Sequence, residues 1–398
     1  MMKKYGWILF SLLSFFILGN LFSSESEPAL DLEFAPSDCV YAHRNAGIPF
    51  MPSDHYDIIL HTISIVNSSS ESIRIDSVTI EALRDGKMIQ SRVLYGEEIV
   101  RISKSMLELF QGDMRTMLDL VLWTDRAVPP GFSLSADLDC GPRSALPVFN
   151  TFLSFSALPD YLRISVKGRG GHDALVRAER ELKVTSYQNK VEYSFPLEGA
   201  WLMTGLPENG VLDHHRVGIP NEFGVDFRRV GPNGELYKGE GKEAGDYYGW
   251  GEKVLAAADG VVAAVNDGAV QKWSRFHPLE GESPAEFEKR FFKEFGEAMK
   301  GNIIDSIGGN SILIKHAEGE YSVYFHLMEN SVRVKVGDRV KRGQPIAAVG
   351  NTGDSFEVHL HFQVVDSPDF WRCRSLPFAF DNIQTQLREP GRFVKPAE

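Results

Sequence analysis

The sequence predicts an all-β-dominated protein: an N-terminal β-sandwich-like domain, then a glycine-rich antiparallel β-sheet domain with an inserted helix. Its 398 residues exceed the roughly 100–200 residues of one domain, so we expect two. Thirty-six glycines and 11% aromatic residues suit turn-rich β structure. Short segments that alternate apolar and polar residues recur along the chain, and this period is typical of strands.

The composition excludes several classes of protein. With 43% hydrophobic and 24% charged residues, the chain is neither disordered throughout nor a polytopic membrane protein. Lys and Arg number 42 against 54 Asp and Glu, which gives a formal net charge of −12. Because a negative surface repels phosphate backbones, we expect no nucleic-acid partner.

The first 24 residues have the pattern of an export signal. Lys3 and Lys4 precede the apolar run Trp7–Leu18, and polar residues follow at Ser23–Glu25. The run is shorter than the roughly 20 residues that cross a bilayer. We therefore expect an exported protein of the periplasm or cell envelope, with an uncleaved N-terminal membrane tether as the alternative.

The three cysteines allow two interpretations. In an oxidising compartment Cys39 and Cys140 would pair and leave Cys373 free. Alternatively, all three are small buried hydrophobic residues.

Residues 40–185 form the predicted sandwich domain, a binding or positioning module for the wall or for an envelope protein. Asp85-Gly86 predicts a hairpin turn, and 97–110 is compatible with a short helix. Its histidines lack ligand-like spacing, so we expect ordinary surface or core roles for His43, His55, His61 and His172. Strands are expected at Ile58–Val66, Ile73–Ile75, Val78–Glu81, Leu118–Trp123, Phe149–Phe155 and Leu162–Lys167.

Residues 190–385 form the predicted second domain, interrupted by an insertion at 271–308. Ser283-Pro284-Ala285-Glu286 is a capping box that begins a helix, and Gly301 can end it. A stripe of Phe287, Phe291, Phe295 and Met299 recurs every four residues, and we expect it to pack against the domain. Strands are expected at Gly251–Val265, Ser311–His316, Tyr321–Leu327, Val332–Val336, Pro345–Val349 and His359–Val365.

The strongest chemical signal is His359-Leu360-His361-Phe362. Residues two apart in a strand project from one face, so both imidazoles can address one site. His326 lies on another predicted strand, and Asp226 is framed by apolar residues, where a carboxylate is costly unless it is paired or metal-bound. His214-His215 precedes that aspartate.

Histidine and aspartate ligands without a thiolate suit a zinc ion that keeps an open position. Zinc brings the pKa of its bound water near 7 and polarises a carbonyl, which is the chemistry of amide hydrolysis. The remaining histidines would act as general base and as stabiliser of the oxyanion.

Several motifs, in order, resemble those of the lysostaphin-type family of zinc endopeptidases, and together they cover roughly 195–365. They are Gly224-Val225-Asp226-Phe227, Gly251-x-x-Val254 with Ala257–Val262, Ile312–His316, Tyr324-x-His326-Leu327, Val336–Gln344, and Gly350-x-Thr352-Gly353 leading into His359–Phe362.

The resemblance implies a glycine-rich antiparallel sheet with a narrow groove that cleaves short peptides of bacterial cell-wall peptidoglycan. It implies zinc ligands at Asp226 and His361, and catalytic roles for His326 and His359. His316 also stands where the family frequently has a histidine, and we expect a structural role for it.

One position departs from the family pattern, because Glu222 stands where the first histidine ligand is expected. His215, or its neighbour His214, would then supply the missing ligand from the preceding loop. Alternatively Glu222 itself binds the metal, or the domain is metal-free and acts as a binding partner or activator of other envelope hydrolases. Gln363 replaces a frequent glutamate, which affects hydrogen bonds around the ligands.

Overall fold

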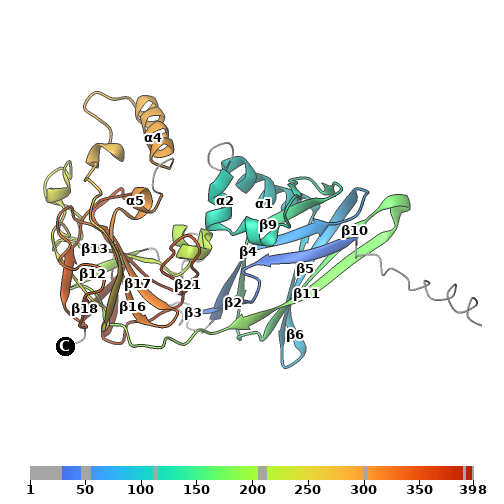
Figure 1. Cartoon of the computed structure of the whole chain (residues 1–398), viewed down its shortest axis with the longest axis horizontal. Helices are drawn as coiled ribbons and strands as arrows, with labels where there is room; N and C mark the ends of the chain where they lie inside the picture. Colours follow the sequence, from blue (N-terminus) through green and yellow to red (C-terminus); the bar gives the residue numbers. More distant parts are fainter. Residues whose placement is uncertain are drawn as a thin grey trace, which may run out of the picture.

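The computed structural model describes residues 29–45, 55–110, 115–204, 213–299, 303–388 and 391–396. Strands dominate these residues, which confirms the predicted fold class (Figure 1). The expected signal or anchor, 1–24, lies outside them. None of the helices in these ranges combines the length and the apolar character needed to cross a membrane.

The N-terminal half contains two sheets that enclose a shared apolar core. One sheet has the order β1 (Leu30–Ala35), β4 (His55–Asn67), β9 (Ser144–Phe155) and β7 (Ser133–Leu134), with β3 (His43–Asn45) beside β4. The other has the order β2 (Cys39–Tyr41), β11 (Leu175–Thr185), β10 (Tyr161–Arg169), β5 (Ile73–Arg84) and β6 (Lys87–Tyr95), with β8 (Asp139–Cys140) beside β5.

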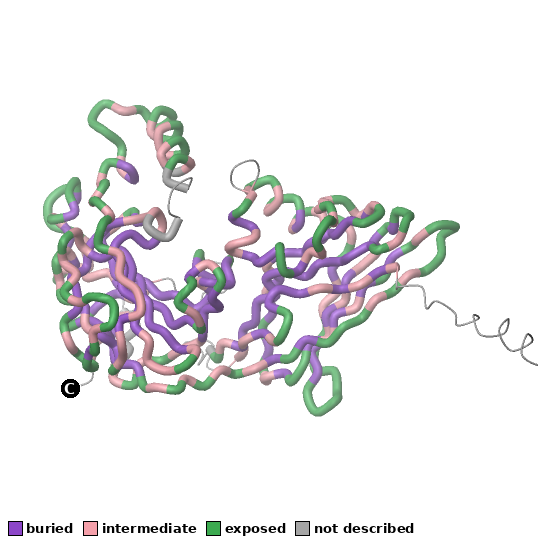
Figure 2. The backbone as a smooth tube through the Cα atoms, in the orientation of Figure 1, coloured by how far each residue is buried: buried purple, intermediate pink, exposed green. Residues whose placement is uncertain are grey.

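The core of this half follows from the period of two along its strands. In β10, Leu162, Ile164 and Val166 are fully buried while their neighbours are not. Burying such side chains contributes roughly 1.5–3 kcal/mol each before entropic costs. Figure 2 shows the buried backbone concentrated where the two sheets face each other. The predicted Asp85-Gly86 turn joins β5 to β6, and both residues have the positive φ of a tight hairpin.

Helices replace one predicted strand. Helix α1 (Gly96–Leu109) occupies the region expected to be helical, and it is followed by α2 (Arg115–Val121) and α3 (Thr124–Ala127). The strand predicted at 118–123 is therefore wrong. Leu118 and Leu122 lie one helical turn apart, and both are fully buried in one cluster with Phe149. A helix buries both leucines on one face, whereas the apolar content alone suggested a strand.

The cysteines are unpaired at all three positions, each of which is described, so the predicted Cys39–Cys140 disulfide is wrong. Cys140 and Cys373 are buried, and this desolvation raises the pKa of both thiols. The interpretation as buried small hydrophobic residues is correct for these two, while Cys39 is half-buried.

The C-terminal half is built on one long sheet. Its order is β18 (Arg339–Val340), β15 (Gly260–Asn266), β16 (Asn310–Ala317), β17 (Glu320–Leu327), β20 (Leu360–Val365), β13 (Val225–Arg228), β12 (Trp201–Thr204), β23 (Gly391–Pro396) and β22 (Ile383–Arg388), with β21 (Ser375–Leu376) beside β20. A separate pair joins β14 (Lys253–Leu255) to β19 (Pro345–Ala348). The strand expected at 332–336 is absent, because the backbone bonds of this stretch, from the Arg333 amide to Ile346 and from the Asp338 amide to Lys335, form no ladder.

Within the described residues, no named strand pair joins the two halves. The sandwich begins with β1, before the predicted boundary at 40, and the second sheet extends beyond 385 to β23. The proposed domain ranges stay a prediction.

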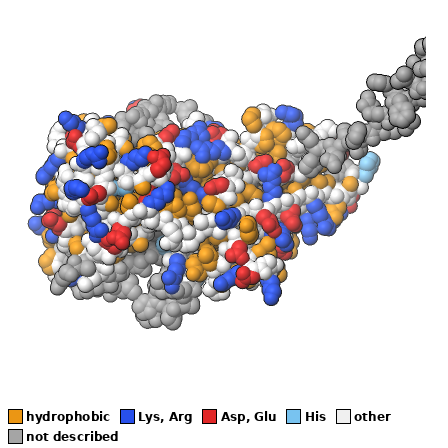
Figure 3. Space-filling model, turned by 60° about the horizontal axis from the view of Figure 1, so that its bottom comes forward, with side chains coloured by type: hydrophobic (Ala, Val, Ile, Leu, Met, Phe, Trp, Pro, Cys, Tyr) orange, Lys and Arg blue, Asp and Glu red, His pale blue; other side chains and the backbone are white. Residues whose placement is uncertain are grey.

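Side chains connect the halves: Arg374 donates to the Cys39 carbonyl at 2.7 Å and pairs with Asp38 at 3.2 Å. Figure 3 shows acidic and basic side chains interspersed over the face in view.

The insertion lies between β15 and β16 and contains η7 (Trp273–Arg275), α4 (Pro284–Met299) and α5 (Ile303–Gly308). The capping box is confirmed: the Ser283 amide donates to Glu286 Oε2 at 3.0 Å, and the Glu286 amide donates to Ser283 Oγ at 3.4 Å. Figure 1 shows α4 projecting from the C-terminal half. Gly301 lies outside the described residues.

The predicted apolar stripe of α4 contacts the domain at one described position. The Phe291 ring lies 5.9 Å from that of Phe276 and 6.0 Å from that of Phe356. On another face of α4, Phe292 is 63% exposed. The helix therefore touches the rest of the domain through a small aromatic cluster.

Candidate metal centre

Strand register brings Asp226 and His361 together. Strands β13 and β20 are antiparallel and place these two residues directly opposite each other, so their side chains share one face. Asp226 Oδ1 lies 3.1 Å from His361 Nδ1, and both residues are almost fully buried. On the other side of β20, Phe325 stands opposite His361, and its ring stacks on the imidazole with centroids 5.5 Å apart.

The third donor, His215, reaches the same point from a short helix, η4 (His214–Val217). Asp213 caps this helix by accepting the His215 amide proton at 2.9 Å. The His215 side chain is 2% exposed, and its Nε2 lies 3.4 Å from Asp226 Oδ1. Ligand atoms of His215, Asp226 and His361 all lie within 4.8 Å of one another, a spacing that fits one cation.

His214 is placed differently from its neighbour. Its side chain is 70% exposed, and its Nε2 lies 3.7 Å from Asp226 Oδ2. It forms a second possible ligand group with Asp213 and His215. His215 is therefore the inner histidine of the pair.

Glu222 points away from this cluster. Its buried carboxylate lies 3.6 Å from the Arg216 guanidinium and 3.9 Å from His61 Nδ1 of strand β4. Burial raises the pKa of Glu222 to about 7. The group that includes Asp226 and His361 is completed by His215 and not by Glu222.

His326 and His359 stand beside the three donors. His359 Nε2 lies 3.6 Å from Asp226 Oδ1. The ring centroids of His326 and His359 are 4.6 Å apart. The Nδ1 atoms bind backbone carbonyls, that of Thr352 at 2.8 Å for His326 and that of Glu357 at 2.7 Å for His359. A carbonyl accepts only from N–H, so both rings carry the proton on Nδ1 and leave Nε2 as an acceptor.

Burial also sets the charge of these two imidazoles. It lowers the pKa of His359 to about 4 and holds that of His326 well below its usual value. Both rings are therefore neutral at pH 7 and able to accept a proton.

His316 lies elsewhere. Its ring contacts the Asp259 carbonyl and Ser322 Oγ at 2.8 and 2.7 Å, which satisfies both nitrogens. These bonds agree with the structural role expected for it.

Gln363 orients His361. Its Oε1 lies 2.9 Å from His361 Nε2, and its amide nitrogen donates to the Pro220 carbonyl at 2.9 Å. This pair of bonds fixes the proton of His361 on Nε2 and leaves Nδ1 as the lone pair facing Asp226.

The donors are strongly coupled by charge. Burial lowers the pKa of His215, but the carboxylates of Asp226 and Asp213 outweigh it and raise that pKa to about 10. Burial raises the pKa of Asp226, yet the charge of His215 holds it well below its usual value. Without a bound cation, the proton on His215 neutralises Asp226, so a metal ion must displace it.

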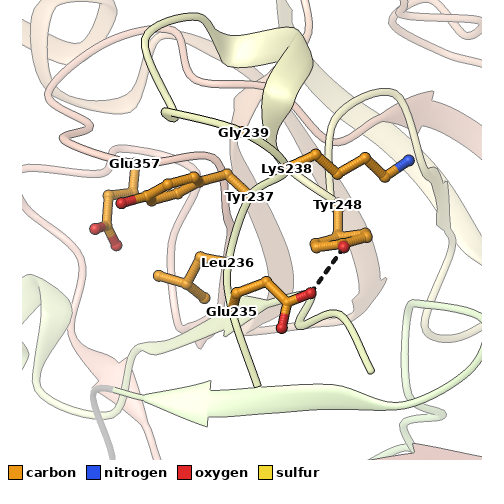
Figure 4. A pocket seen from close by; sticks show the side chains of 7 residues that line it. All are labelled: Glu235, Leu236, Tyr237, Lys238, Gly239, Tyr248 and Glu357. Atoms are coloured by element: carbon orange, nitrogen blue, oxygen red, sulfur yellow. Dashed lines mark hydrogen bonds between the residues drawn. The ribbon is translucent and has the colours of Figure 1, made fainter. Parts of the chain in front are cut away.

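A cavity opens at this site, and a second cavity shares one lining residue with it. One, of about 700 Å³, is lined by the five residues discussed and by His214, Asn221, Arg228, Ile307, Phe325, Asp354, Phe356, Glu357 and Phe370. The second, of about 730 Å³, is lined by Glu235, Leu236, Tyr237, Lys238, Gly239, Tyr248 and Glu357. Glu357 belongs to both, and Figure 4 shows it beside the Tyr237 ring, with Glu235 bonded to Tyr248.

Sequence reasoning did not find several wall residues. Ile307 comes from helix α5 of the insertion, and Asp354, Phe356 and Glu357 come from the loop before β20. No spacing rule links these loops to the strands. Gly224, just before Asp226, could have indicated that the backbone approaches another residue closely at this point. An added Cβ at 224 would lie 2.6 Å from His361 Cε1.

Comparison with known proteins finds a family match over part of the C-terminal half. Residues 298–369, which include His326, His359 and His361, match the model of peptidase family M23, and this match confirms the resemblance predicted from the motifs.

Two curated relatives match short stretches. Peptidoglycan DD-endopeptidase ShyC of Vibrio cholerae is 29% identical over 97 residues, which are 22% of this chain and 22% of that protein. Glycyl-glycine endopeptidase ALE-1 of Staphylococcus capitis is 49% identical over 57 residues, 14% of this chain and 15% of that protein. The chain thus spans less than a quarter of each relative. A solved zinc-containing peptidase from Vibrio cholerae is 13% identical, covering 84% of this chain and 86% of that chain, with a TM-score of 0.25.

Substituting Gly224→Ala should disturb the centre. The new methyl group would force the His361 ring out of its present position, at a cost of about 1–3 kcal/mol typical of overpacking. Chemical denaturation measures this loss. Gly245→Ala is the matched control, because its added Cβ meets nothing within 4 Å, and an equal effect in both variants would contradict the prediction.

Glu222 should make stability depend on pH. Since its folded pKa of about 7 exceeds its usual value, the folded protein keeps a proton that the unfolded chain loses. Its stability contribution is complete below pH 4.5 and falls as pH rises through 7. In metal-free protein, the free energy of unfolding of Glu222→Gln should exceed that of the parent by an amount that grows by about 3 kcal/mol between pH 4.5 and pH 7. Denaturation midpoints across pH test this, with Glu288→Gln on exposed α4 as control; a constant difference across pH would contradict it.

Proposed function

We propose that the protein is a zinc-dependent endopeptidase that hydrolyses peptide bonds in bacterial cell-wall peptidoglycan. The convergence of His215, Asp226 and His361 in the wall of a cavity that also holds two neutral histidines carries this proposal. The substrate class is supported by the family match and by relatives such as the peptidoglycan DD-endopeptidase ShyC.

The donor set fits zinc. Two imidazoles and one carboxylate, all buried and without a thiolate, are the three protein ligands typical of a catalytic zinc ion with an open position. His215, Asp226 and His361 would hold the ion. When bound there, zinc lowers the pKa of a water and polarises the carbonyl of the scissile bond.

The remaining histidines move the proton. His359 Nε2 carries no proton and lies 3.6 Å from Asp226 Oδ1, beside the position of the metal, so this atom would take the proton of the attacking water. The resulting imidazolium then gives the proton to the leaving amine. His326, held by the Thr352 carbonyl, orients the reacting groups from the other side. The strong hydrogen bonds of both Nδ1 atoms keep the rings in place through these steps.

The cavities suit an extended peptide. Because Glu357 lines both, a peptide can run from the metal centre across this residue to the pocket that contains Tyr237 and Tyr248 (Figure 4). The signal-like segment at 1–24 supports a site of action in the periplasm or cell envelope, with a possible tether through that segment. The sandwich would dock the enzyme to the wall or to an envelope protein.

Loss of bound zinc should abolish cleavage of wall peptides. We expect purified protein to hold about one equivalent of zinc and chelation to abolish cleavage of wall peptides. His361→Ala should lose both metal and activity, whereas His326→Ala should lose activity and keep zinc.

Elemental analysis and a peptide-release assay measure these two properties, with His316→Ala as the control that keeps both. Native protein without zinc and without cleavage would instead support a catalytically inactive binding partner or activator of other envelope hydrolases.

The identity of the first ligand is tested by three variants scored by zinc content. His215→Ala should lose the metal, because it removes one of the three buried donors. His214→Ala should retain it, because that side chain is largely exposed, and Glu222→Ala should also bind zinc. Loss of zinc only in the Glu222 variant would overturn this assignment.

A further inference from the structure

We infer that the N-terminal sandwich is a structural part of the metal centre, because it positions the segment 213–222 that carries His215. This inference rests on the proposed function, and it assigns the sandwich a role inside the site in addition to any docking role.

The segment 213–222 has little regular secondary structure that would stabilise its conformation. Asp226 and His361 are fixed by the ladder between β13 and β20, whereas His215 lies on no strand. It sits on η4, a 3₁₀ helix of four residues, followed by η5 (Ile219–Asn221), one of three residues. Such short 3₁₀ turns are weakly stable alone, so tertiary contacts must determine where His215 points.

The hydrogen bonds from the C-terminal half to the backbone of this segment and of the next residue lie at one end of it. The Gln363 amide donates to the Pro220 carbonyl at 2.9 Å, and the Phe223 amide donates to Ser375 Oγ at 3.0 Å. Both contacts lie after His215, at least five residues away. At the His215 end, the Asp213 cap is local to the segment itself.

The sandwich holds the middle of the segment. Ile219 is fully buried in a cluster whose other members, Ala35, Trp123 and Ala127, all belong to the N-terminal half. The Val217 carbonyl accepts a bond from Asn150 Nδ2 at 3.2 Å. Further along, His61 of β4 lies 3.9 Å from Glu222.

Gly218 shows how closely the two halves approach. An added Cβ there would lie 2.7 Å from Cγ1 of Val121, at the end of α2. Its φ of −128° is open to any residue, so only this contact excludes a side chain. Gly218 is three residues from His215, and a shift of the segment away from α2 would move His215 relative to Asp226. Metal sites tolerate displacements of only about 0.5 Å.

A rescue experiment in the full chain tests the inference. Gly218→Ala should push the segment from α2 and weaken zinc binding about 10–100-fold, as loss of supporting contacts around ligands does. Val121→Ala removes the obstructing methyl group and should leave affinity within about threefold of the parent, and the double variant Gly218→Ala/Val121→Ala should return close to it. Competition with a chelating dye measures the affinity.

Arg372→Ala is the matched control. It removes an exposed ion pair with Asp125 that also joins the two halves but does not touch the segment, so affinity should not change. Gly218→Ala with parental affinity would overturn the inference, and so would a double variant as weak as the single one, because a general folding defect would not be repaired by Val121→Ala.

A second measurement separates this inference from the proposed function. In metal-free protein, hydrogen exchange of 213–222 should accelerate in Gly218→Ala, return in the double variant and stay parental in Arg372→Ala. If the parent bound no zinc, the zinc proposal would fail, yet this exchange pattern would still support the positioning of the segment by the sandwich. Unchanged exchange in Gly218→Ala would overturn it.

Discussion

The buried carboxylate of Asp226 is the constraint on which the site depends. An isolated buried charge is too costly to persist, and burial by itself raises the pKa of this group. The imidazoles of His215, His359 and His361 lie within 3.1–3.6 Å of its Oδ1, and the protonated ring of His215 keeps it ionised. The Asp226 carboxylate is surrounded by imidazole nitrogens and also lines a cavity. At such a place a metal ion can replace the proton of His215.

The sheet supplies most of this arrangement. The pairing of β13 with β20 sets Asp226 against His361, and the pairing of β17 with β20 sets Phe325 on the other side of the same imidazole. A slip of one residue in either pairing would send these side chains to the opposite face. Gln363, two residues further along β20, then fixes the His361 tautomer from that same face.

The unusual feature is the source of the third donor. Where the family pattern has a ligand, Glu222 lies in a buried contact with Arg216 and His61, and the imidazole beside Asp226 comes instead from His215 on a short helix. That helix has no ladder of its own, and the two residues after it pack on the sandwich: Gly218 against Val121 of α2, and Ile219 in a cluster with Ala127 of α3. Because His215 stands beside Asp226 in place of residue 222, the geometry of the site depends on the interface between the two halves.

Sequence by itself determined what local physics decides. Alternation along strands gave the β-dominated class, the capping box at Ser283 marked the start of α4, and the His-x-His pair with Asp226 located the centre. Only tertiary structure chose His215 over His214 and Glu222, turned 115–121 into a helix, and left Cys39 unpaired from Cys140. These outcomes depend on which distant segments pack together, and the free energy of such contacts is not encoded in the spacing of neighbouring residues.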